Sequence, residues 1–158
     1  MQKIKNSEYG YLGNHNIKRD GIETSFTKEE IIEYIKCMED PSYFAIKYCK
    51  IISLDEGLIP FNLYDYQQEM FTHFNNNRFS IVLACRQSGK SISSVIYLLW
   101  YAIFHPEVVI GIIANKGITA REMLSRITLA LENLPFFLQP GCKAVNKGSL
   151  EFSNNSRI

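Results

Sequence analysis

The 158-residue sequence predicts an α/β fold built on a parallel β-sheet. Two short runs of apolar, mostly β-branched residues, 78–84 and 107–114, have the length and composition of buried strands. Each run is followed by a stretch in which apolar side chains recur at helical spacing, 90–104 and 117–134. A strand, a loop, a helix, a strand and a helix in this order are typical of a parallel α/β sheet.

Composition and charge set broad limits on function. The chain is 46% hydrophobic and 21% charged, as in ordinary globular proteins, and its formal net charge of +1 does not indicate nucleic-acid binding by the whole surface. The first 21 residues hold no apolar run, and the longest apolar stretch, 95–104, is far shorter than the roughly 20 residues of a membrane span. We therefore expect a soluble intracellular protein that has no membrane contact.

The cysteines do not suggest a metal site. Cys37, Cys49, Cys85 and Cys142 form no C-x-x-C pair and have no histidine at zinc-ligand spacing. We expect free thiols, most of them in or near the core.

The first part of the chain predicts an arm and then a small helical region. Residues 1–25 are polar and rich in glycine and asparagine, which predicts an extended or mobile arm, and the helical region covers 26–60. Thr27 and Glu30 form a capping box that marks the start of the first helix. Three apolar side chains share one face of that helix: Ile31, Ile35 and Met38.

The next elements follow from turn and cap residues. Asp40 and Pro41 end the first helix and begin a second, because aspartate suits the N-cap and proline the first helical position. Residues 55–60 predict a turn, and 143–158 predict a β-hairpin around Asn146-Lys147-Gly148. A helix is expected over 63–74, with three side chains buried: Tyr66, Met70 and Phe74.

Residues 84–91 match the Walker A pattern of phosphate-binding loops, although Ala84 stands at the first position, where glycine is usual. The loop follows a predicted strand and opens a predicted helix, which is the context that the motif requires. Its backbone N–H groups are expected to point at phosphate oxygens. We therefore predict a P-loop NTPase domain of the RecA/helicase-like type over 61–158, with incomplete sheet. Its nucleotide-binding loop residues are Ala84, Cys85, Arg86, Gln87, Ser88, Gly89, Lys90 and Ser91.

Residue type assigns a role to several loop positions. Gly89 lets the backbone approach a phosphate closely, Lys90 reaches the β- and γ-phosphates, and the Ser91 hydroxyl ligates Mg²⁺. The alternative is a lysine that begins a helix in an unrelated α/β domain. Arg86 has two interpretations as well: a solvated or ion-paired loop residue, or a cis arginine that stabilises charge on the γ-phosphate.

Gln67 lies on the predicted helix before the loop, and its amide has the donor and acceptor that an adenine edge can use. The alternative is an ordinary exposed glutamine. Asp55 and Glu56 follow an apolar run as a Walker B pair does, but they precede the loop and are interpreted as turn residues. After Ser91 no apolar run ends in an acid, so a metal-holding aspartate and a water-activating glutamate are not found in this chain.

Several stretches, in their order and spacing, resemble the large terminase subunit of T-even-like tailed phages, the ATP-driven motor that packages double-stranded DNA into the prohead. They are "DPSYFAIKYCKI", "SLDEGLIPFNLYDYQQEM", "RQSGKS", "VVIGIIANKGITAREMLSRI" and "LENLPFFLQPGCKAVNKGSLEFSN". The resemblance covers nearly the whole chain after the N-terminal arm. It includes a loop with a non-glycine first residue and an internal Arg-Gln pair.

The resemblance implies roles and partners. It makes Lys90 and Arg86 catalytic, with Arg86 as the cis arginine finger, and Gln67 the adenine contact; Lys116 and Arg121 become candidates for the DNA-coupling side. The implied ligands are ATP and Mg²⁺. The implied partners are double-stranded DNA, the portal protein, the small terminase subunit and further copies in a ring on the portal, in the host cytoplasm.

The family's Walker B pair, coupling motif and nuclease domain are expected after residue 158. We therefore expect an N-terminal part of such an ATPase, inactive by itself. Two alternatives stay open: part of a helicase-type DNA translocase, and a non-catalytic nucleotide-binding or interaction module.

Overall fold

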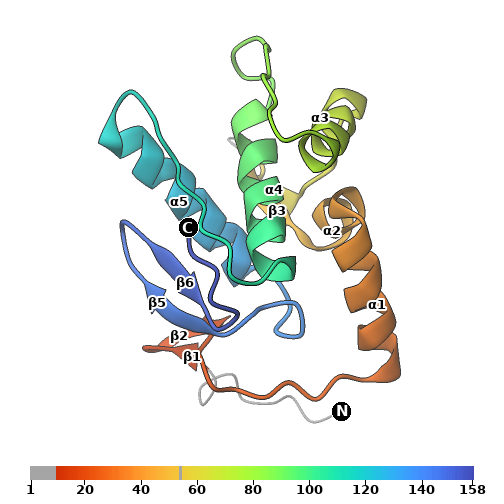
Figure 1. The fold of residues 1–158 in the computed structure, drawn as a ribbon, viewed down its shortest axis with the longest axis vertical. Coiled ribbons are helices and arrows are strands. Elements are labelled where there is room, and N and C mark those ends of the chain that lie inside the picture. The colour runs from red at the N-terminus through yellow and green to blue at the C-terminus, as the bar shows by residue number, and fades with distance from the viewer. Residues whose placement is uncertain (1–9, 54) are drawn as a thin grey trace.

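A computed structural model describes residues 10–53 and 55–158 and shows a mixed α/β fold (Figure 1). The described strands form three separate two-stranded antiparallel sheets. In chain order the elements are β1 (Gly10–Tyr11), β2 (Asn14–Lys18), α1 (Lys28–Glu39), α2 (Pro41–Tyr48), β3 (Lys50–Ser53), β4 (Gly57–Pro60), α3 (Asp65–Asn76), α4 (Lys90–Phe104), α5 (Gly117–Glu132), β5 (Cys142–Val145) and β6 (Leu150–Phe152).

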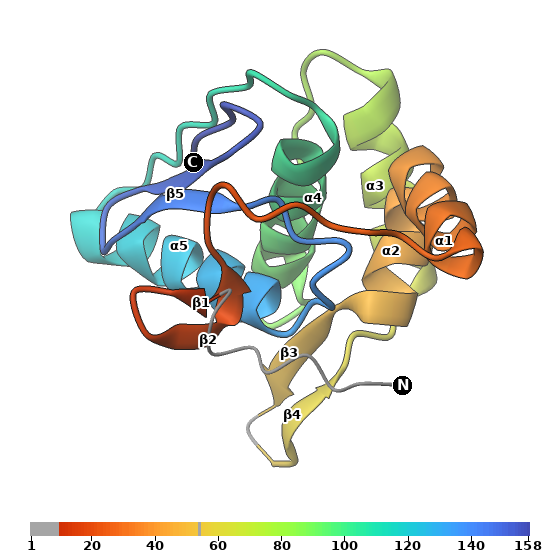
Figure 2. The same ribbon diagram turned by 90° about the horizontal axis from the view of Figure 1, so that it is seen from below.

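Helix α4 is the centre of the core. It packs against α2, α3 and α5, and Figures 1 and 2 show it between α5 on one side and the α1–α2 pair on the other. Its predicted apolar face is confirmed, since Val95, Ile96 and Leu99 are fully buried. Trp100 on the same helix donates its indole N–H to the Cys37 carbonyl at 2.7 Å, which joins α4 to the end of α1.

The predicted caps of the first two helices are confirmed. The Thr27 hydroxyl accepts from the Glu30 N–H at 3.2 Å, and the Glu30 carboxylate accepts from the Thr27 N–H at 2.8 Å. The Asp40 carboxylate accepts from the Ser42 N–H at 2.7 Å, which caps α2. These bonds involve neighbouring residues, so the sequence alone was enough to predict them.

The apolar face predicted for α1 is not the side of the helix that packs on the core. Ile31, Ile35 and Met38 lie 43–47% exposed, whereas Cys37 is fully buried. Tyr34 makes an edge-to-face contact with Phe104 on α4, with ring centroids 5.1 Å apart. An apolar period shows that a helix has an apolar face, but here the aromatic and tryptophan contacts with α4 decide which side docks.

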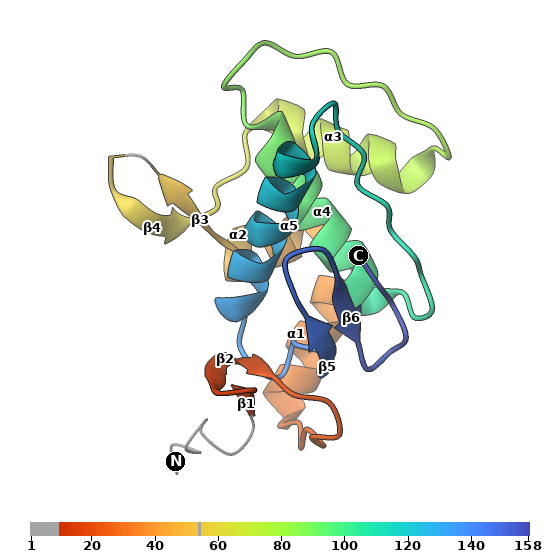
Figure 3. The same ribbon diagram turned by 90° about the vertical axis from the view of Figure 1, so that its left-hand side faces the viewer.

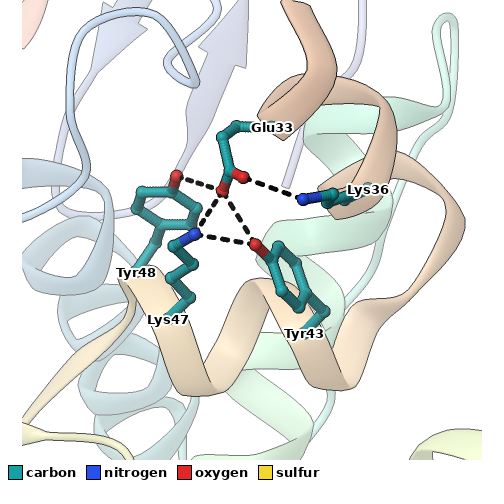
Figure 4. A network of polar contacts seen from close by, with 5 residues as sticks. All are labelled: Glu33, Lys36, Tyr43, Lys47 and Tyr48. Atoms are coloured by element: carbon teal, nitrogen blue, oxygen red, sulfur yellow. Dashed lines mark hydrogen bonds and ion pairs between the residues drawn. The ribbon is translucent and has the colours of Figure 1, made fainter. Parts of the chain in front are cut away.

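A polar cluster around Glu33 joins α1 to α2 (Figure 4). The Glu33 carboxylate accepts from the Lys47 ammonium at 2.6 Å and from the hydroxyls of Tyr48 and Tyr43, each at 2.8 Å. Lys36 on its own helix lies 3.2 Å away. The hydrogen bond from Lys47, followed by those from the two tyrosines, lowers the pKa of Glu33 from 4.5 to about 2.

Replacing Glu33 with glutamine is expected to lower the melting temperature at neutral pH and to flatten its dependence on acid. Because the folded-state pKa is lowered, the carboxylate stabilises the fold above its ordinary pKa of 4.5, and this contribution is lost as the pH falls towards 2. Melting curves followed by circular dichroism should show the two proteins converging over that range. A difference that stays constant down to the acid end would contradict this role.

The N-terminal arm predicted for 1–25 packs against the rest of the chain over its described residues, 10–25. Residues 1–9 lie outside the described part of the chain. The strands β1 and β2 form a hairpin, and Ile17 is only 1% exposed. Buried Gln139 holds this hairpin: its amide oxygen accepts from the Lys18 N–H at 2.9 Å, and its amide nitrogen donates to the Asn16 carbonyl at 2.9 Å. The polar composition of the arm hides this attachment, because its partner lies more than a hundred positions away in the sequence.

Gln139→Met is expected to destabilise the protein by about 2–4 kcal/mol, because buried backbone groups lose their partner. Besides its bonds to β2, the Gln139 amide donates to the carbonyls of Leu131 at 3.0 Å and Leu134 at 2.8 Å. Urea unfolding measures the loss. The exposed Gln68→Met is the control and should stay within about 0.5 kcal/mol. Equal stability of the two variants would show that Gln139 does not fasten the hairpin.

The two predicted parallel strands are the main error. In the described structure 78–84 has no strand, and Ile81 and Leu83 are 98% and 100% exposed. In 107–114, the described structure has one β-bridge, between Val109 and Arg157, and Ile113 is 97% exposed. Figure 3 shows 77–89 as a wide arc from α3 to α4. Both segments have strand-like composition, but a strand also needs neighbours to pair with, and the described residues supply almost none.

Two hairpins complete the fold. Asp55 and Glu56 are turn residues as predicted, while Gly57–Pro60 is a strand rather than part of the turn; Leu54 lies outside the described residues. The resulting β3–β4 hairpin, with Ile51 opposite Ile59, projects from the helices (Figure 2). The predicted C-terminal hairpin is confirmed by the pairing of β5 with β6.

Candidate nucleotide-binding site

The predicted P-loop, 84–91, runs into the start of α4, so its last two residues, Lys90 and Ser91, belong to that helix. Gln87 and Gly89 have left-handed backbone angles, with φ of +63° and +77°. Gly89 is the N-cap of α4, and Lys90 is the first residue of the helix. The left-handed angle at Gly89 is one that glycine adopts without steric cost.

The start of α4 is suited to an anion. The first N–H groups of any helix lack partners within the helix and carry partial positive charge. At α4 no side chain caps them, and the first turn contains no acidic residue. Since the helix is 15 residues long, its dipole adds to the attraction. A phosphate is a suitable ligand for such an end.

Lys90 folds back over the loop. Its ammonium donates to the Cys85 carbonyl at 2.9 Å, and the Ser88 hydroxyl donates to the same carbonyl at 3.0 Å. The ammonium is therefore held at the loop, beside the helix start. A bound phosphate would offer the Lys90 ammonium a charged acceptor in place of the neutral carbonyl. A hydrogen bond to a charged acceptor is the stronger of the two.

Helix α3 contacts the loop through Gln67 and Tyr66. Gln67 is 2% exposed, and its amide oxygen accepts from the Tyr64 N–H at 2.9 Å. Its amide nitrogen lies 2.5 Å from the point that a Cβ on Gly89 would occupy. The Tyr66 hydroxyl donates to the Ser88 carbonyl. Gln67 thus lies beside the P-loop as a buried packing group, not as the exposed glutamine of the alternative, and its contact with adenine stays a prediction.

The predicted buried face of α3 is partly wrong. Of the three side chains predicted to be buried, Met70 is buried, Phe74 is half-buried and Tyr66 is 40% exposed. Gln67 and Phe71 are buried as well. A polar residue, Gln67, therefore lies on the inward side of α3, where it contacts the loop.

A cavity of about 680 Å³ opens beside the loop, within the usual size range of small-molecule sites. Besides loop residues, Lys50 on β3 and Arg126 on α5 line it, and the described lining contains no carboxylate. Ser91 lines it too, with Gln87, Gly89, Lys90, Ile51, Ile52, Ile92 and Leu129. The sequence analysis missed Lys50 and Arg126, because each lies more than 30 positions from the loop and neither belongs to a motif.

The remaining loop residues lie outside this cavity's lining. Arg86 and Cys85 are exposed, so both interpretations of Arg86 stay open. Ala84 is half-buried and lines a second hollow, of about 510 Å³, between α3 and the segment 79–84.

The predicted DNA-side residues are exposed and separate from the cavity. Lys116 is the N-cap of α5, and Arg121 lines a hollow of about 200 Å³ together with Lys147. The structure does not bring either residue into the cavity beside the P-loop, and their role towards DNA stays a prediction.

The predicted Mg²⁺ site has a single protein ligand among the described residues, Ser91, and its binding of Mg²⁺ stays a prediction. The Ser91 side chain is exposed and lines the cavity, so its hydroxyl is accessible. Over 10–53 and 55–158, no group of three or more histidine, cysteine, aspartate or glutamate side chains could hold a metal ion. Nucleotide-bound Mg²⁺ takes most of its ligands from phosphates and water.

A comparison of the sequence with protein-family models finds no match. Within the described part of the chain, no helix combines the length and apolarity that a membrane crossing requires.

Proposed function

We propose that the chain binds ATP with Mg²⁺ at the P-loop and is the nucleotide-binding part of a terminase-type DNA-packaging ATPase. One observation carries the nucleotide site: a Gly-Lys-Ser turn opens a buried helix beside a basic cavity with no carboxylate in its described lining. Both the helix start and the cavity favour an anion of triphosphate size.

In this proposal each residue acts on the phosphate chain. The N–H groups at the start of α4 bind phosphate oxygens, and the Lys90 ammonium moves from the Cys85 carbonyl to the β- and γ-phosphates. The Ser91 hydroxyl ligates Mg²⁺, which neutralises phosphate charge when bound. Exposed Arg86 is free to swing towards the γ-phosphate.

We expect binding with little hydrolysis. Hydrolysis needs a group that orients or activates water, and the described residues that line the cavity supply no carboxylate for that role. The chain alone should therefore hold ATP without turning it over at a useful rate.

The packaging role rests on the sequence resemblance. The apolar side chains that are exposed in 78–84, and Val109 and Ile113 in 107–114, agree with a sheet that needs further strands. Under this proposal the complete motor acts on double-stranded DNA, as a ring on the portal, with the small terminase subunit.

The test of nucleotide binding is a thermal shift. A ligand at 100 times its dissociation constant stabilises the folded state by about 2.7 kcal/mol, which raises the melting temperature of a chain of this length by roughly 5–10 °C. We expect such a rise with ATP and Mg²⁺ and a much smaller one with AMP. Equal shifts with ATP and AMP would mean that the loop does not contact the β- and γ-phosphates, and no shift with either would argue for a module that binds no nucleotide.

A further inference from the structure

The cavity beside the P-loop has a second basic wall. We propose that Arg126 on α5 and Lys50 on β3 bind the phosphate chain of the nucleotide together with Lys90. This inference rests on the proposed function and extends it to elements outside the loop.

The first argument is position. The cavity is lined by the first residues of α4, by β3 and by the middle of α5, so Lys90, Lys50 and Arg126 reach it from three different elements. Helix α5 packs along α4, as Figures 1 and 2 show, which fixes Arg126 relative to the loop. At about 680 Å³ the space suits a nucleotide, whereas a DNA duplex is far wider than such a hollow.

The second argument is charge. The lining holds these three cations and no described carboxylate, and the ion pairs of the described residues lie elsewhere, at Glu33 and Glu151. Like charges around one hollow repel each other and attract an anion. A triphosphate chain supplies several negative oxygens close together, and an arginine fork can bind two of them at once.

The third argument is the character of the remaining wall. Ile51 and Ile52 on β3 and Leu129 on α5 give the cavity an apolar side next to its cations. Small-molecule sites combine such a wall with a few placed polar groups. The three cations and the helix start would hold the phosphates, and the less polar part of the nucleotide would lie against the apolar side chains.

The test is calorimetric titration of ATP and ADP, with Mg²⁺, into the full chain and its variants. We expect Arg126→Ala to weaken ATP binding about 10-fold, the strength of one charge-assisted hydrogen bond, and Lys50→Ala about 3-fold. Both losses should be smaller for ADP, which carries less charge. Arg126→Lys should recover part of the affinity, because it keeps the charge but not the fork.

Arg78→Ala is the matched control: an exposed arginine that stacks on Phe79 and does not line the cavity. It should bind ATP within 2-fold of the unmodified chain, because the substitution removes an arginine that does not line the cavity. If Arg126→Ala also stays within 2-fold while Lys90→Ala loses binding, this inference is overturned and the P-loop site stands. If the unmodified chain binds no ATP, the proposed function fails, and this inference with it. Circular dichroism checks that each variant folds, and Arg126→Gln replaces Arg126→Ala if it does not.

Discussion

Lys90→Ala is expected to weaken ATP binding by about 10- to 100-fold while leaving the fold intact. The ammonium lies at the mouth of the loop, beside the uncapped start of α4, where it can donate to a phosphate. Charge-assisted hydrogen bonds contribute about 1.5–3 kcal/mol, which corresponds to this loss. In the free protein the side chain is half-buried and its hydrogen bond goes to one exposed-loop carbonyl, so the melting temperature without nucleotide should change little.

Lys28→Ala provides the matched control. Lys28 is the first residue of α1, as Lys90 is of α4, and its side chain is exposed. The two substitutions remove the same charge from the same helical position, but only one lies beside the cavity. Titration of both variants with ATP separates a specific phosphate contact from a general effect of net charge. Similar affinities for the two would contradict the role of Lys90.

Gly89→Ala is expected to destabilise the fold by about 2–3 kcal/mol and to weaken ATP binding as well. The left-handed backbone angle of this position, with φ of +77°, is about 1–2 kcal/mol less favourable for alanine than for glycine. The new Cβ would also lie 2.5 Å from the amide nitrogen of Gln67. That side chain is buried and tied to the Tyr64 N–H, so it cannot move away without losing its bond. Either α3 or the loop must shift.

Two further variants separate these causes. Gly21 has nearly the same backbone angle, with φ of +78°, and nothing lies within 4 Å of its added Cβ. Gly21→Ala should therefore show the backbone cost alone. The extra cost at Gly89 should disappear when Gln67→Ala is combined with Gly89→Ala, which urea unfolding of the single and double variants measures. An unchanged cost in the double variant would mean that Gln67 does not hold the loop.

The features that the sequence predicted well depend on neighbouring residues. The capping box of Thr27 and Glu30, the start of α2 at Asp40 and Pro41, and the turn at Gly89 are set by side chains a few positions apart. The apolar face of α4 was also correct, because that helix is buried along most of its length and its pattern is unambiguous.

The features that failed depend on partners distant in the sequence. Segments 78–84 and 107–114 have the composition of strands, but their pairing is a property of the whole sheet. The described residues leave 78–84 unpaired and give 107–114 one β-bridge, at Val109. Ile17 is buried because Gln139 fastens β2 to the end of α5, which no local pattern reveals. Arg126 joins the site for a similar reason: the packing of α5 on α4 carries it to the cavity.

The central claim is that this chain binds a nucleoside triphosphate through its P-loop. Calorimetric titration of the chain with ATP and Mg²⁺, repeated with Lys90→Ala, measures that claim directly. We predict saturable binding of one ATP per chain, with an affinity that falls about 10- to 100-fold in the variant. Absence of saturable binding, or an affinity that Lys90→Ala leaves unchanged, would contradict it.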